Sequence, residues 1–267
     1  MMFFDGLRRI AVMVLAPVVF CGAVAAGDLT ARDIASQLHK AGAGTPIDLS
    51  ARDLSNLDLA GLDFKSAILA RANLYGVDLS ASNLSGVNLA GAKLDRAIVS
   101  RADFSNANLE GASVLRPSVY TSLDFNPSET PKFAGANLKG ATLIARLDGA
   151  DFTGADLSGA TVGPLNEADD TLVTRSSRMI APNFTGANLA GAVLRHVDFS
   201  YGRFAGANLA GASLKNANLA NADLTGADLT GADVSETNFE GANLTGAKGL
   251  ETMKGVSTAR NLDRTLR

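Results

Sequence analysis

The chain has 267 residues, of which 46% are apolar but only 6% aromatic, and it contains no Trp. This composition predicts an interior built from small and aliphatic side chains. Its 24 Lys and Arg residues against 27 Asp and Glu residues give a formal charge of −3. A charge so close to balance argues against a basic nucleic-acid-binding domain and against an extreme acidic tail.

The N-terminus has the layout of a cleavable secretory signal peptide over residues 1–26. An arginine pair at 8–9 precedes an apolar run at 10–20, and small residues follow that run. The run is short for a membrane span, and a buried N-terminal helix is the alternative. We expect cleavage before Gly27, or at the neighbouring Ala25. The product would be a periplasmic or secreted protein without stable membrane insertion.

Residues 27–45 have the signals of a short N-terminal capping segment. Thr30 and Asp33 have the spacing of a capping box, and Ile34 and Leu38 give an apolar face to the residues that follow. The pattern predicts a helix over residues 31–40.

From residue 46 to residue 249 the sequence repeats a word of five residues, as in ADLTGADLTG at 222–231. In extended backbone the Ala and the Leu two positions later face one side, and the Asp or Asn between them faces the other. The last two residues, often Thr and Gly, are suited to turning a corner. A strand this short is stable only as one side of a coil that stacks on similar coils.

This repeated word resembles the signature of the pentapeptide-repeat family, and the resemblance covers about three quarters of the chain. It implies an all-β fold, a right-handed quadrilateral β-helix with one word on each side of a square coil. At about 4.8 Å per coil, roughly nine coils would give a column near 43 Å long.

Three interruptions break the repeat, at 115–132, 145–149 and 163–181. We count the sides of the square from Leu49 as side one and let Phe125 supply one of the irregular words. Every central Phe then falls on side four or side one. In the same count all three interruptions fall at side four and its adjoining corners, in successive coils.

Because loops on a rigid scaffold often carry function, the interrupted side is the candidate partner-binding patch. Insertions that are merely tolerated at a coil corner are the alternative, since long surface insertions cost little free energy. The charged and aromatic residues available in the patch are Arg116, Tyr120, Asp124, Glu129, Lys132, Arg146, Asp148, Glu167, Asp169, Asp170, Arg175 and Arg178.

The C-terminal segment, residues 250–267, leaves the five-residue pattern. Leu250, Met253, Val256 and Leu262 can cover the last coil, whose apolar interior would otherwise be open. A contact between two copies of the chain is the alternative use of this segment.

Residues suited to catalysis are scarce. His39 and His196 are the only histidines and have no second histidine at ligand spacing, which argues against a metal site or a Ser-His-Asp arrangement. The only cysteine, Cys21, would leave with the signal peptide. Asp169 and Asp170 form the best carboxylate pair, but a solvated acidic loop explains them more simply. We expect no catalytic, cofactor-binding or metal-binding residues.

The sequence therefore favours a non-catalytic exported protein that binds a protein partner through the loop patch. A purely structural envelope component and a carbohydrate-active enzyme are the alternatives. The resemblance adds another, because some family members protect DNA gyrase by imitating DNA with an acidic rod. The export signal and the nearly balanced charge of this chain depart from that case.

Overall fold

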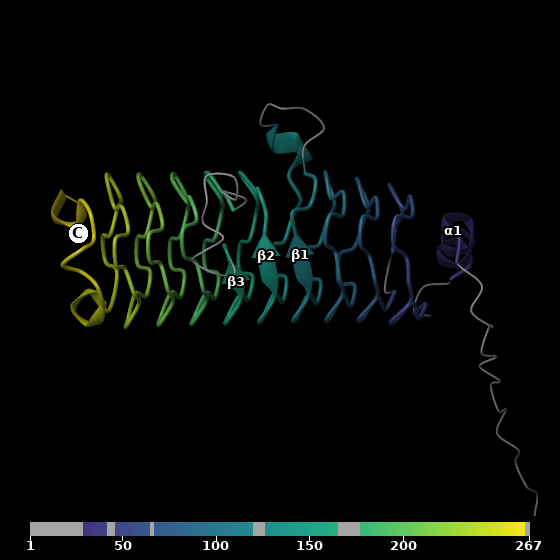
Figure 1. Cartoon of the computed structure of the whole chain (residues 1–267), viewed down its shortest axis with the longest axis horizontal. Helices are drawn as coiled ribbons and strands as arrows, with labels where there is room; N and C mark the ends of the chain where they lie inside the picture. The colour runs from purple at the N-terminus through teal and green to yellow at the C-terminus, as the bar shows by residue number, and fades with distance from the viewer. Residues whose placement is uncertain (1–28, 42–45, 65–66, 120–125, 165–176, 265–267) are drawn as a thin grey trace, which may run out of the picture.

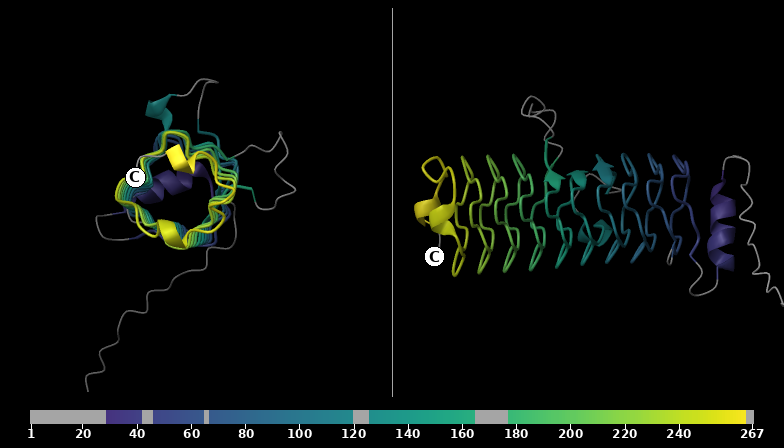
Figure 2. Two further views of the ribbon diagram at one scale, coloured as in Figure 1. Left: turned by 90° about the vertical axis from the view of Figure 1, so that its left-hand side faces the viewer. Right: turned by 90° about the horizontal axis from the view of Figure 1, so that it is seen from below.

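The computed structural model describes residues 29–41, 46–64, 67–119, 126–164 and 177–264. These residues form a rod of stacked coils with one helix, α1, at its N-terminal end (Figure 1). Seen along the rod, the coils superimpose on an outline with four corners (Figure 2). The architecture is the right-handed β-helix that the repeat predicts. The predicted signal peptide lies outside the described residues.

Neighbouring coils are joined by parallel bridges between the outward-facing residues of equivalent words. Asn188 bridges Asn208, and Asn208 bridges Asp228, so the regular coil advances by 20 residues. Around each bridge, backbone hydrogen bonds join a coil to both the next coil and the previous one. The Leu209 N–H donates to the carbonyl of Asp228 at 2.7 Å, and the Asn208 N–H donates to that of Ala187 at 2.9 Å.

The longest bridged segments lie in the middle of the rod. Strands β1 (Ser113–Leu115), β2 (Thr142–Ile144) and β3 (Thr161–Val162) pair in parallel in the order β1-β2-β3. They belong to one side of three successive coils (Figure 1). The contraction of the repeat follows β2, and the second insertion follows β3.

The bridges assign every central residue to a side of the square, and all of them are buried. Following Leu49 along its column defines side one, with the centres Leu49, Leu69, Leu89, Leu109, Leu138, Leu157, Leu189, Leu209 and Leu229, one for each of nine coils. Sides two, three and four follow in chain order within each coil. Coils are numbered below from the N-terminus.

The sequence count of sides is wrong after Val119. Asp103 bridges Lys132, which places Phe133 directly below Phe104 on side four. The count took Phe125, which lies outside the described residues, as an additional side. Every later word is therefore one side earlier than the count gave.

The corrected register gathers most central Phe residues into one column. On side four, neighbouring rings in the series Phe104, Phe133, Phe152, Phe184 and Phe204 stack nearly parallel, with centroids between 4.7 and 5.1 Å apart. The expectation that all central Phe residues occupy sides four and one fails. Phe199 and Phe239 belong to side three.

The interruptions also leave the square at different corners from those expected. Residues 120–131 separate side three from side four, and η1 (Pro127–Glu129) in this stretch stands outside the coil outline (Figure 2). The contraction between Leu143 and Leu147 separates side two from side three. The words before and after the second insertion, centred on Val162 and Met179, are sides two and three of the next coil. The three do not share side four.

Helix α1 (Ala31–Lys40) covers the first coil with buried Ile34 and Leu38. Its capping box is formed as the sequence predicts: the Asp33 N–H donates to the Thr30 hydroxyl at 3.2 Å, and the Thr30 N–H donates to the Asp33 carboxylate at 3.1 Å. The apolar face of α1 thus packs on the open N-terminal end of the column.

At the other end, η3 (Leu250–Thr252) and η4 (Leu262–Arg264) close the rod. Lys254 bridges Asp233 and Arg260 bridges Asn238, so the chain continues the coil irregularly past the last word. Leu262 is buried, but Val256 is 41% exposed, so its expected part in the cap is wrong.

Candidate functional site

The four corners of the coil differ in the residues that turn them. The last residue of a word adopts the left-handed region, with φ between 51° and 70°. At the two corners that flank side one this residue is Gly throughout the later coils: Gly91, Gly111, Gly140, Gly159, Gly191, Gly211 and Gly231 after side one, and Gly135, Gly154, Gly186, Gly206, Gly226 and Gly246 after side four. Glycine adopts this conformation without steric cost.

The two corners that flank side three mostly carry side chains instead. The residues with positive φ there are Asn56, Gly76, Arg96, Arg116, His196, Asn216 and Glu236 after side two, and Gly61, Ala81, Arg101, Gly149, Ala181, Tyr201, Asn221 and Gly241 after side three. A residue with a Cβ in this region costs about 1 kcal/mol or more relative to Gly, Asn least. Backbone preference therefore does not explain the Arg and His residues. From coil 3 onward the large side chains displayed at this cost flank side three, whereas in coil 2 Arg71 adopts the same conformation after side one.

Six cations follow one another along this wall, one in each of coils 3 to 8. We call them the basic face: Arg96, Arg116, Arg146, Arg178, Arg195 and Lys215. The Arg96 N–H donates to Leu115 beside Arg116, and Arg146 bridges Arg178. At about 4.8 Å per coil, the six cations form a row roughly 24 Å long.

The acidic residues on this wall are already hydrogen-bonded. Asp95 accepts from the Ser113 hydroxyl at 2.5 Å and the Leu115 N–H at 3.1 Å. Asp198 accepts from the Ser200 N–H at 3.0 Å and the Asn218 amide at 2.9 Å. In the described part of the chain, Arg96, Arg116, Arg146 and Arg195 make no ion pair. The six cations of coils 3 to 8 exceed the three carboxylates among them, Asp95, Asp148 and Asp198, so this stretch of the wall carries an excess of positive charge.

One cation of the face is held rigidly. The Arg178 guanidinium donates through Nε and one terminal nitrogen to the carboxylate of Asp148, which is buried. The Ile180 N–H donates to the same carboxylate at 2.9 Å. Asp148 thereby anchors the chain where the insertion at 163–178 rejoins the coil.

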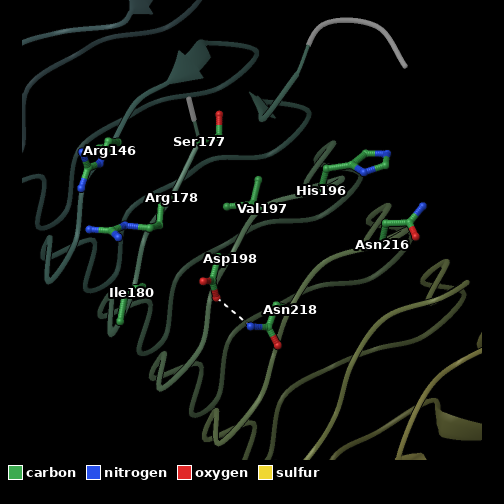
Figure 3. Close-up of a pocket in the computed structure, with 9 residues that line it drawn as sticks. All are labelled: Arg146, Ser177, Arg178, Ile180, His196, Val197, Asp198, Asn216 and Asn218. Carbon is green, nitrogen blue, oxygen red and sulfur yellow. Dashed lines mark hydrogen bonds between the residues drawn. The ribbon is translucent and has the colours of Figure 1, made fainter. Parts of the chain in front are cut away.

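A surface hollow of about 600 Å³ lies at the middle of the basic face. Its lining residues are Arg146, Ser177, Arg178, Ile180, His196, Val197, Asp198, Asn216 and Asn218. In the close-up, Ser177 lies between Arg146 and His196, while Arg146 and Arg178 run side by side (Figure 3). Donor groups from four successive coils therefore meet at one place.

A family model for pentapeptide repeats matches the chain in eight copies, over residues 47–80, 82–114, 132–162, 183–216 and 207–246. The chain belongs to the pentapeptide-repeat family. The unmatched stretches between these ranges coincide with the two insertions. No curated protein sequence matches the chain.

Solved structures of other pentapeptide-repeat proteins resemble it. HetL, involved in heterocyst differentiation regulation in the cyanobacterium Nostoc sp. strain PCC 7120, is 24% identical over 87% of this chain and 94% of its own, with a TM-score of 0.42. The plasmid-mediated fluoroquinolone resistance protein QnrB1 is 18% identical over 79% of this chain and 86% of its own, with a TM-score of 0.34. A protein of the Arabidopsis thaliana thylakoid lumen is 31% identical over 46% of this chain and 70% of its own, with a TM-score of 0.23.

The structure of this pentapeptide-repeat protein brings together part of the predicted patch. Arg116, Arg146 and Arg178 lie on the basic face, and Asp148 is the buried partner of Arg178. Lys132 lies on side four instead, bridging Asp103 and Asp151.

The remaining predicted residues do not join the face in the described structure. Glu129 belongs to η1, outside the coil outline. Tyr120, Asp124, Glu167, Asp169, Asp170 and Arg175 lie outside the described residues.

Several residues of this wall were not predicted as site residues: Arg96, Ser177, Arg195, His196, Lys215, Asn216 and Asn218. A signal for some of them was present in the sequence. In LDRA at 94–97 and LRHV at 194–197, a large side chain replaces the Gly that normally ends the word. The wrong side count hid the fact that these words share a corner.

The described residues hold no group of three or more His, Cys, Asp and Glu side chains placed to bind a metal ion. Within those same residues no helix combines the length and hydropathy of a membrane span. The side chains that line the hollow offer positive charge and hydrogen-bond donors and acceptors.

Proposed function

We propose that this pentapeptide-repeat protein is a non-catalytic binding module that holds an acidic protein partner on its basic face. Members of the family commonly bind proteins and are generally non-catalytic. The observation that carries the proposal is the placement of Arg96 and Arg116 at corners where Gly would be less strained. Side chains kept at a cost in stability are most simply explained by a task at the surface.

A protein partner fits the charge distribution better than a nucleic acid does. The basic face is a single row, and Asp95 and Asp198 interrupt it. The other walls carry acidic residues such as Asp103, Asp151 and Asp223, and the whole chain is formally −3. A long polyanion would therefore be repelled beyond the row, whereas a local acidic patch would be attracted.

The same charge argument favours an acidic partner over a DNA-binding enzyme such as gyrase. An imitation of DNA must present negative charge, and the strained corners mainly present positive or neutral side chains. Glycan cleavage by Asp169 and Asp170 stays a prediction, because both lie outside the described residues. The part that the two insertions play in binding stays a prediction for the same reason.

We also propose that the protein works outside the cytoplasm. The support is the sequence of residues 1–26, with its arginine pair, apolar run and small residues before Gly27. The partner would then be an envelope or extracellular protein. N-terminal sequencing of the protein recovered from cells tests this, and a chain that keeps residues 1–26 would contradict it.

The binding proposal is tested with a charge-reversed triple variant, Arg96→Glu, Arg116→Glu and Arg195→Glu. The tagged wild-type chain is cross-linked in cells, and the joined proteins are identified by mass spectrometry. We expect an acidic protein that is lost with the triple variant and with rising salt. The matched control is Arg71→Glu, Lys139→Glu and Lys248→Glu on and beside side one, which should keep the partner. Equal cross-linking by both variants would refute the basic face as the binding surface.

A further inference from the structure

We infer that side two carries a second part of the binding surface, an apolar strip that binds an amphipathic helix of the acidic partner. The inference rests on the proposed function and deepens it, because it names the structure that the partner presents to the rod. The strip consists of five outward side chains from coils 4 to 7: Leu115, Thr142, Ile144, Thr161 and Val193. It includes the outer face of the sheet β1-β2-β3 (Figure 1).

Backbone bridges place the residues of the strip in two adjoining columns. Thr142 bridges Thr161, and Thr161 bridges Val193, so three β-branched side chains follow one another at the second place of the word. Leu115 pairs with Ile144 at the fourth place. All five are partly exposed, whereas the central residues of the same words are buried. The strip is therefore a mainly apolar surface that runs roughly 14 Å along the rod.

Side one shows which bonds this wall lacks. In coils 3 to 8 the second place of the word on side one always holds Asp or Asn, and on side two it never does. On side one Asn188 accepts from the Ala190 N–H at 3.2 Å and from the Asn208 amide at 3.1 Å. Val193, in the same coil as Asn188, can accept neither bond. Apolar side chains that are partly open to water and replace stabilising hydrogen bonds indicate a partner that covers them.

Cations border the strip along its edge towards side three. Arg195 and Lys215 occupy the fourth place of the word on side two, and Arg96 and Arg116 turn the corner that ends it. The two arginines at the corner belong to coils 3 and 4, and the other two cations belong to coils 7 and 8. Positive charge therefore lies beside both ends of the strip. A partner that covers it must carry acidic groups next to its apolar ones.

The backbone of the wall favours a helix over a strand as the partner segment. The Thr142 N–H donates to Ala112 at 2.9 Å, and the Val193 N–H donates to Ala160 at 2.8 Å, so the peptide groups here already bond to neighbouring coils. A partner strand could not extend this wall by backbone hydrogen bonds. One helical turn rises about 5.4 Å, close to the spacing of about 4.8 Å between coils. A helix along the rod would place an apolar stripe on the strip and acidic residues beside the cations.

The test measures the affinity of the purified chain for synthetic helices of about 18 residues by fluorescence anisotropy, each stapled on its outer face to keep it helical. The first helix has a Leu stripe bordered by Glu in every turn. The second has Gln in place of Leu, and the third has Gln in place of Glu. The altered protein is a ladder variant, Thr142→Asn, Thr161→Asn and Val193→Asn. We expect it to bind the first helix about tenfold more weakly than the wild type does, and the second helix equally well.

Matched controls separate binding from folding. The ladder variant should keep or raise the Tm, because Asn137, Asp156 and Asn188 hold the same place in the same coils on side one. Ile68→Asn makes the same kind of change on side one, so it should leave the affinity for the first helix unchanged. The charge-reversed triple variant should bind the first helix about tenfold more weakly, and its affinity for the third helix should change little.

The inference is overturned if the wild type binds the first helix no more tightly than the other two, or if the ladder variant binds it as tightly as the wild type does. Binding to phosphatidylglycerol vesicles that the ladder variant weakens, without binding to any helix, would overturn it in favour of a lipid surface. The proposed function fails separately, when the charge-reversed triple variant keeps its cross-linked partner. A partner lost with that variant but kept by the ladder variant would refute only the strip.

Discussion

Side one and side three are built from the same five-residue word but differ in almost every outward feature. Side one has Gly at its flanking corners in the later coils and a ladder of amides along its surface. The Asn208 amide donates to Asn188 at 3.1 Å, and the Asn137 amide donates to Asn108 at 2.9 Å. Side three has strained corners, two neighbouring breaks in register and an ion pair whose carboxylate is buried.

This difference shows that the column does not require regular walls. The inward Ala and Leu positions are buried on both sides, so the core is continuous past the breaks. What changes is the outward surface. Amide bonds join the coils along side one, whereas on side three such bonds begin only at Asp198, and Arg96, Arg116, Arg146 and Arg195 make no ion pair within the described residues. The rod is thus a scaffold whose one irregular wall is free to take a binding role.

The ion pairs of the two walls provide the largest expected contrast. Asp148 on side three is buried and accepts from both Arg178 and the Ile180 N–H. Asp148→Ala would leave that N–H and the guanidinium without their acceptor, and we expect it to lower the free energy of unfolding by about 2–3 kcal/mol. Urea unfolding followed by circular dichroism measures the change.

The matched change on side one is Lys139→Ala. Lys139 pairs with Asp156 at 3.3 Å, but the two side chains are 51% and 32% exposed. A surface pair of this kind contributes little, so we expect a change within about 0.5 kcal/mol. Equal decreases in the free energy of unfolding for Asp148→Ala and Lys139→Ala would show that the side-three pair stabilises the fold no more than the surface pair does.

Much of the fold could be predicted because short stretches of the repeat determine it. Thr30 and Asp33 have capping-box spacing, and helix α1 begins there. The alternation of Ala and Leu with Asp and Asn predicted which residues are buried, and the burial of Leu209 and Ala207 around exposed or half-buried neighbours is typical. These features depend on residues fewer than five apart in sequence.

The side count and the site depend on residues much farther apart. Nothing local distinguishes Phe125, for which the bridges leave no side, from a central Phe such as Phe133, because both follow a polar residue. Arg146 and Arg178 are neighbours across 32 residues, and only the bridge between them reveals it. In the described part of the chain the buried Ser177 hydroxyl has no hydrogen-bond partner, a three-dimensional fact with no counterpart in the sequence.

The corners offer a second contrast, smaller than that of the ion pairs. A Cβ built at Gly211 beside side one meets nothing within 4 Å, so Gly211→Ala tests backbone strain without a clash. We expect it to destabilise by about 1 kcal/mol. Arg96→Gly relieves the same strain after side two. We expect it to stabilise the fold by up to about 1 kcal/mol, because the backbone entropy that Gly loses on folding offsets only part of the strain that is relieved. Urea unfolding compares the two, and destabilisation by both would remove the argument that Arg96 is kept at a cost.

Acid gives the finest contrast, between outward carboxylates and outward amides: in the last coil side one carries Asp228 where side three carries Asn238. The Thr230 hydroxyl and N–H donate to Asp228 at 2.6 and 2.9 Å, and these bonds hold the pKa of Asp228 below its ordinary value of 3.8. The Ser50 bonds lower the pKa of Asp48 in the same way. A carboxyl whose pKa is lower in the folded state stabilises the fold above its unfolded value, and that contribution is lost as pH falls through the folded value.

We therefore expect the Tm of the wild type to fall as pH is lowered from about 5 to about 3, where these carboxyls begin to be protonated. Asp228→Asn should fall slightly less over this window. Its amide oxygen still accepts the N–H two residues later, as Asn208 does from Ala210 at 3.0 Å, but does not titrate. Asn218→Asp on side three removes the amide that donates to Asp198 and brings two carboxylates together, so acid relieves their repulsion and its Tm should fall less than that of the wild type. Scanning calorimetry of the three proteins measures the slopes, and identical slopes would show that the outward carboxylates do not couple protonation to folding.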